Sequence, residues 1–151
     1  MISTSYHVLF LCTGNSAGGF PRGEIHPAAL NLLRGLDHPI DHLRSKSWDE
    51  FAGPSAPQID FIVTVCDNAA AETCPIWPGQ PATVRWGLPD PAAVDGSDDD
   101  IAQTFSFTYH LLSNQISAFI QLALDSFDKA ELLSQLVVID PSIARSTQDA
   151  V

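Results

Sequence analysis

Residues 6–17 read YHVLFLCTGNSA, an apolar run followed by a short series of small residues. The apolar part, residues 6–12, is continuous rather than alternating, which is typical of a parallel strand buried on both faces. Two further runs have the same character: IDFIVTVCD at residues 59–67 and ATVRWGL at residues 82–88. Three buried strands of this kind predict a parallel sheet.

Helical patterns separate and follow these strands. Residues 27–36 carry leucines at helical spacing with a glycine near the end, and residues 47–50 read SWDE, the pattern of a capping box. Apolar residues recur every three or four positions over residues 99–127, and a last short helix is expected over residues 128–136. The alternation predicts an α/β fold, a small parallel sheet with helices on both faces, in one domain spanning residues 1–151.

The composition excludes several classes of partner. Asp and Glu number 18 against 7 Lys and Arg, which gives a net charge of −11. An extended nucleic-acid interface or an anionic membrane surface would need clustered basic residues. No apolar run is long enough for a transmembrane helix. The three cysteines are an odd number, too few for a disulfide scaffold, and indicate a reducing cytoplasm.

The first candidate site is the loop after the first strand. Successive backbone N–H groups in a tight loop behind Cys12 can bind an oxyanion and lower the pKa of the thiol, which makes a thiolate nucleophile. The residues that would supply these groups are Thr13, Gly14, Asn15, Ser16 and Ala17. The alternative is a buried structural cysteine followed by an ordinary turn.

The second candidate is Asp90, which lies between Pro89 and Pro91 just after the third strand. A stiff loop suits a general acid, because the acid must meet a leaving oxygen at hydrogen-bonding distance. The alternative is an aspartate that only shapes a turn.

The third candidate is the pair Cys66 and Cys74, which flank a segment of small and polar residues. A disulfide between them requires Cα atoms within about 7 Å, which such a segment could allow. Two of three cysteines around one loop favour a redox pair over two unrelated thiols.

These motifs together resemble a known family. In order, the chain carries VLFLCTGNSA, HPAALNLL, LRSKSWDEF, TVCDNAAAETCP, WPG, WGLPDPA and YHLLSNQI. Over residues 8–136 it is similar to the thiol-dependent arsenate reductases of the low-molecular-weight tyrosine phosphatase fold. Phosphatases of that fold usually carry tyrosines after the catalytic Asp-Pro, where this chain has Ala92 and Ala93.

The resemblance implies a mechanism without cofactor or metal. Cys12 would attack the arsenic of an arsenate, or a phosphate-like oxyanion, held by the loop amides, and Asp90 would protonate the leaving hydroxyl. Cys66 would attack the Cys12 adduct and release arsenite, and Cys74 would take over the disulfide. Thioredoxin or a glutaredoxin-type partner would reduce it.

The chain departs from the family after Ala17. The arginine of the family's Cys-x5-Arg loop would stand at position 18, where this chain has Gly18, and the first helix and second strand of the family are missing. The missing guanidinium removes a bidentate contact to the oxyanion, so impaired activity is expected. Arg22, ten residues after Cys12 on a Gly- and Pro-rich loop, could replace this guanidinium by folding back over the site; the alternative is a solvent-exposed loop residue.

Three hypotheses follow: an arsenate reductase, a catalytically impaired remnant that acts as a binding domain, and a tyrosine phosphatase-like hydrolase. The missing strand would also expose a sheet edge, which favours a homodimer.

Overall fold

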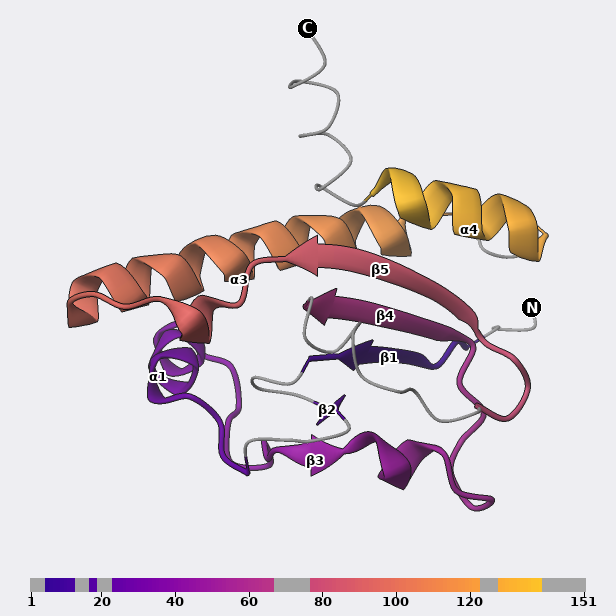
Figure 1. The fold of residues 1–151 in the computed structure, drawn as a ribbon, viewed down its shortest axis with the longest axis horizontal. Helices are drawn as coiled ribbons and strands as arrows, with labels where there is room; N and C mark the ends of the chain where they lie inside the picture. The colour runs from indigo at the N-terminus through magenta and orange to yellow at the C-terminus, as the bar shows by residue number, and fades with distance from the viewer. Residues whose placement is uncertain (1–4, 13–16, 19–22, 67–76, 123–127, 140–151) are drawn as a thin grey trace, which may run out of the picture.

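The computed structural model of the chain describes residues 5–12, 17–18, 23–66, 77–122 and 128–139 (Figure 1). No helix in these ranges combines the length and the apolar character needed to cross a membrane. The elements in chain order are β1 (Val8–Leu11), β2 (Ala17–Gly18), α1 (Pro27–Gly35), β3 (Lys46–Ser47), the 3-10 helix η1 (Trp48–Phe51), β4 (Phe61–Cys66), β5 (Ala82–Leu88), the 3-10 helix η2 (Pro91–Ala93), α3 (Asp98–Ile120) and α4 (Lys129–Val138).

The strands form one sheet in the order β3-β2-β1-β4-β5, and every pairing is parallel. Val8 lies beside Phe61 and Leu11 beside Thr64, so β1 and β4 run together over the whole length of β1. The predicted α/β class with a small parallel sheet is confirmed. The apolar runs identified the three adjacent strands β1, β4 and β5. Residues 61–65 of β4 are all buried, whereas β5 is an edge strand and exposes Thr83 and Arg85 on one face.

The two faces of the sheet carry different layers. One face packs Phe61, Val63 and Trp86 against α3 and α4. The other packs Leu9 and Ile62 against Trp48 of η1 and its neighbours. Among the described residues, this second face is therefore covered by a 3-10 helix rather than by an α-helix, which differs from the expected pair of helical layers.

The two-residue strand β2 lies beside β1, where a missing strand was expected, and β3 forms the edge of the sheet on that side. Adjacent parallel strands ordinarily need a crossover of a dozen or more residues, yet β2 follows β1 after residues 12–16. The short connection suffices because β2 begins beside the last residue of β1, with Ala17 opposite Leu11. Ala17, which was expected in the oxyanion loop, is thus the first residue of β2.

The ends of the helices follow local side-chain bonds. Ser47 caps η1 through Asp49 N–H, but Glu50 bonds Arg44 at 2.6 and 2.8 Å instead of completing the predicted capping box. A complete box opens α4, where Asp128 and Glu131 exchange backbone-to-carboxylate bonds. The long helix α3 ends at Ile120, before the expected position 127.

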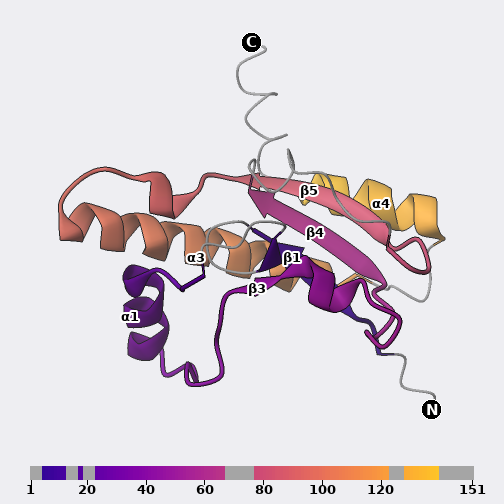
Figure 2. The ribbon, with the colours of Figure 1, turned by 60° about the horizontal axis from the view of Figure 1, so that its bottom comes forward.

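Figure 1 and Figure 2 both show α1 beside the N-terminal part of α3, beyond the carboxyl ends of β4 and β5. The space between these two helices and the strand ends is where the candidate site lies.

Candidate functional site

Three strand ends bring side chains to one face of the sheet. Side chains alternate along a strand, so Cys12 falls on the same face as Val8 and Phe10, which pack into the core formed with Phe61 and Val63. Val65 near the end of β4 and Leu88 at the end of β5 lie on this face too. The parallel register therefore gathers Cys12, Val65 and Leu88 at one end of the sheet.

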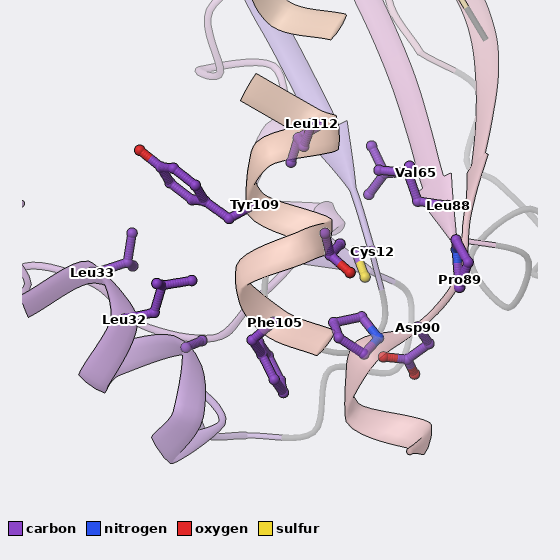
Figure 3. Close-up of a pocket in the computed structure, with 13 residues that line it drawn as sticks. Cys12, Leu32, Leu33, Val65, Leu88, Pro89, Asp90, Phe105, Tyr109 and Leu112 are labelled. Atoms are coloured by element: carbon purple, nitrogen blue, oxygen red, sulfur yellow. The ribbon is translucent and has the colours of Figure 1, made fainter. Parts of the chain in front are cut away.

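These three residues line a cavity of about 240 Å³ (Figure 3). Its remaining walls come from α1, from α3 and from the segment after β5. The lining residues from these elements are Ala29, Leu32, Leu33, Pro89, Asp90, Pro91, Phe105, Thr108, Tyr109 and Leu112.

Asp90 enters the cavity because of two local features. The pairing of β4 with β5 shifts by one residue between Thr64 and Cys66, a bulge at the end of β5; bulges commonly re-aim side chains beside functional sites. Asp90 then caps η2, where its Oδ1 accepts a bond of 2.9 Å from Ala92 N–H. Figure 3 shows the carboxylate and the Cys12 sulfur facing the same part of the cavity.

Two histidines attach α1 to α3 and so fix the outer wall. The His26 ring stacks on Phe105 with ring centres 4.7 Å apart, while its Nδ1 accepts from Ala28 N–H and caps α1. His38 Nε2 lies 2.9 Å from the Tyr109 hydroxyl. These contacts were not predicted, because they join residues far apart in the sequence. The position of His26 before Pro27, at a helix start, was the one local signal.

The charge of the cavity is unusual for an oxyanion site. Of the lining residues that the structure describes, none is Lys, Arg or His, and Asp90 is an acid. Placing an anion in apolar surroundings beside a carboxylate is unfavourable without a compensating donor. Any such donor has to come from outside this set of residues.

The other predicted site residues lie only partly within the described ranges. Cys66 ends β4, and its backbone pairs with Leu88; its side chain is outside the description. Gly18 is the second residue of β2. The residues outside the described ranges altogether are Thr13, Gly14, Asn15, Ser16, Arg22 and Cys74. The structure therefore brings together Cys12 and Asp90, whose catalytic roles stay predictions.

The known proteins to which this chain is similar are arsenate reductases. No family model matches the chain. An arsenate reductase of Staphylococcus xylosus is 30% identical over 112 residues, which cover 60% of this chain and 82% of that protein. Arsenate reductases of Halalkalibacterium halodurans and Bacillus subtilis are 25% and 24% identical over 135 residues, 76% of this chain and 94% of each relative.

Among solved structures, the chain resembles a thioredoxin-dependent arsenate reductase of Corynebacterium glutamicum. The TM-score is 0.44 and the sequence identity 21%, over 78% of this chain and 65% of that one. The chain thus spans about two thirds of the length of the solved protein.

Proposed function

The chain belongs to the arsenate reductase family, and we propose that it reduces arsenate to arsenite with Cys12 as the nucleophile. The observation that carries this proposal is the convergence of Cys12 and Asp90 on one cavity at the carboxyl ends of the strands. This is where open parallel sheets bind their ligands, and a thiol beside a carboxyl group provides a nucleophile and an acid.

In the first step, the Cys12 thiolate forms a sulfur–arsenic bond and an arsenic–oxygen bond breaks. The leaving hydroxide takes a proton from Asp90 and departs as water. The stiff placement of Asp90, between two prolines and bonded to Ala92, supports this role because a general acid needs a fixed position. The backbone amides of residues 13–16 are the proposed oxyanion donors, and Arg22 is the proposed source of positive charge.

In the second step, the Cys66 thiolate attacks the Cys12 sulfur. The electron pair of the sulfur–arsenic bond passes to arsenic, so As(V) becomes As(III) while two thiols become a disulfide. Cys74 then takes over the disulfide from Cys12. The position of Cys66 supports this relay, because it ends β4, the strand that is hydrogen-bonded to β1.

The resulting disulfide needs an external reductant. A thioredoxin or glutaredoxin-type partner is the proposed donor, since it reduces disulfides by thiol exchange. A cytoplasmic location belongs to the same proposal, because that compartment keeps thiols reduced.

A second candidate is a binding domain without turnover. The observation that favours it is the absence of any cation among the described residues of the cavity, together with glycine at position 18. Loss of one preorganised electrostatic stabiliser typically lowers a rate by about 10²–10³-fold. We therefore expect slow turnover if the first candidate is right.

The deciding experiment measures arsenite formation by the purified chain with thioredoxin, its reductase and NADPH. Arsenate-dependent turnover that disappears in Cys12→Ser supports the reductase. No turnover by a chain that unfolds cooperatively favours the binding domain. Hydrolysis of an aryl phosphate without arsenite formation favours a phosphatase-like hydrolase.

We also propose a homodimer. In the described part of the chain, β2 meets β1 only at Leu11, so Val8, Leu9 and Phe10 have no strand neighbour on that side. Unpaired strand edges invite pairing with another chain. Light scattering on the purified protein should give twice the chain mass, and a monomer mass would remove this part of the proposal.

A further inference from the structure

The polar atoms of the cavity are confined to one end. Besides Cys12 and Asp90, only Thr108 and Tyr109 among the described lining residues have polar side-chain atoms. The Thr108 hydroxyl donates to Thr104 C=O at 2.9 Å, and the Tyr109 hydroxyl lies 2.9 Å from His38. Both groups are therefore engaged elsewhere. Figure 3 shows Cys12 and Asp90 on the side of the cavity at the strand ends, with Leu32 and Leu33 of α1 on the far side.

The cavity, whose lining is mostly apolar, is large enough for a ring. An apolar cavity of about 150 Å³ in a protein interior binds benzene, and this one measures about 240 Å³. Its side chains on α3 are held in place: Phe105 is 4% exposed and stacks on His26. A cavity with fixed apolar walls and one polar end suits a ligand with a hydrocarbon group and a polar head.

We propose that the cavity binds the hydrocarbon substituent of an organic arsonate, of about phenyl size, with the arsonate head at Cys12 and Asp90. This inference rests on the proposed function, because it assigns a substrate class to that site. A hydrocarbon substituent replaces one ionisable hydroxyl of arsenate. The arsonate head therefore brings less negative charge to a cavity whose described lining contains an acid and no cation.

The reaction is the one proposed for arsenate, with the arsenic–carbon bond left intact. Cys12 forms the bond to arsenic, and one arsenic-bound hydroxyl leaves as water with the proton of Asp90. A second thiol then attacks the Cys12 sulfur, and the bonding pair stays on arsenic. The products are a trivalent organic arsenous acid and one disulfide, which the thiol reductant named above returns to two thiols.

The test measures how fast Cys12 is alkylated in the reduced chain, with the modified residue located by mass spectrometry. Two reagents are compared, N-benzyl and N-methyl chloroacetamide, with free glutathione as the reference thiol. The ratio of benzyl to methyl rates should be at least about tenfold higher at Cys12 than for glutathione, because the ring is removed from water. Phenylarsonate should slow the methyl reagent at concentrations at least about tenfold below those that arsenate requires.

Cavity-filling variants identify where the ring binds. Ala29→Phe, on the α1 wall, should bring the rate ratio close to that of glutathione, and Leu32→Trp provides the same test if Ala29→Phe does not fold. The matched control is Ala102→Phe, an exposed alanine on α3 outside the cavity, which should leave the ratio unchanged.

Two results overturn the inference. One is a ratio of benzyl to methyl alkylation rates at Cys12 of the parent chain that equals the ratio for glutathione. The other is a high ratio at Cys12 without any slowing of alkylation by phenylarsonate. A high ratio with protection by phenylarsonate, but no turnover of arsenate, counts against the proposed function alone. Turnover of arsenate with a ratio equal to that of glutathione counts against this inference alone.

Discussion

The side chain of Asp90 has one observed role and one proposed role, and one substitution can separate them. Its Oδ1 caps η2 through Ala92 N–H, and the other purpose is the proposed proton donation. Asn keeps a carbonyl oxygen for the cap but cannot donate the proton of a carboxylic acid. In Asp90→Asn we expect kcat for arsenate to fall about 10²–10⁴-fold, while KM changes little.

Steady-state kinetics with thioredoxin as reductant measure this effect. Asp95→Asn is the matched control, since Asp95 is exposed and does not line the cavity; its kinetics should equal those of the parent chain. An Asp90→Asn variant with unchanged kcat would show that the proton comes from another donor.

At the residue scale, the sequence predicted two residues that line the same cavity, but not the other walls of that cavity. Cys12 and Asp90 could be placed because each follows a strand, and parallel strand ends converge. The contacts of His26 with Phe105 and of His38 with Tyr109 depend on how α1 docks on α3. No local pattern encodes that docking.

The start of α3 is an element whose stability should depend on pH. Ser97 caps the helix, and its hydroxyl and backbone N–H both donate to Asp100. These bonds, the hydroxyl bond first, hold the pKa of Asp100 below its usual value. A carboxyl whose pKa is lower in the folded state stabilises the fold above its unfolded pKa, and this contribution disappears as the pH falls through the folded pKa.

Ser97→Ala should lower the free energy of unfolding by about 1 kcal/mol near neutral pH, the usual effect of losing an N-cap. The difference from the parent chain should shrink in acid, as Asp100 becomes protonated. Urea unfolding near neutral pH and in acid measures this difference, with Ser117→Ala at an exposed position in the last turn of α3 as the control. A difference that is equal at both pH values would be evidence against the capping box.

The sequence patterns predicted the bounds of some helices and strands more accurately than those of others. The strand at residues 82–88 was predicted to the residue, because its apolar run is bounded by prolines. Two-residue strands such as β2 and β3 have no periodicity to detect. The helix ending at Ile120 was predicted too long, since apolar residues continue at helical spacing beyond it.

In the molecule as a whole, one tryptophan connects the sheet to the last helix. Trp86 on β5 is completely buried, and its Nε1 donates to Leu136 C=O at 3.2 Å. Trp86→Phe removes the donor and leaves a buried carbonyl without this partner, so we expect a loss of about 1–3 kcal/mol in unfolding free energy.

Hydrogen exchange shows which elements are destabilised by Trp86→Phe. Amides of α4 should exchange faster in Trp86→Phe, because α4 packs on β5, while amides of α1 should change only as much as the global stability does. Trp77→Phe, at a half-buried position on the other sheet face, is the control. Equal acceleration in α1 and α4 would contradict a local connection through Trp86.

The chemistry at Cys12 is tested most directly by a single turnover without reductant. The fully reduced chain is mixed with arsenate, and released arsenite and remaining thiols are counted. We predict that each chain releases one arsenite and loses two thiols. In Cys12→Ser we predict no arsenite release and no loss of thiols. Arsenite release by Cys12→Ser, or a parent chain that keeps all of its thiols while arsenite forms, would contradict Cys12 as the nucleophile.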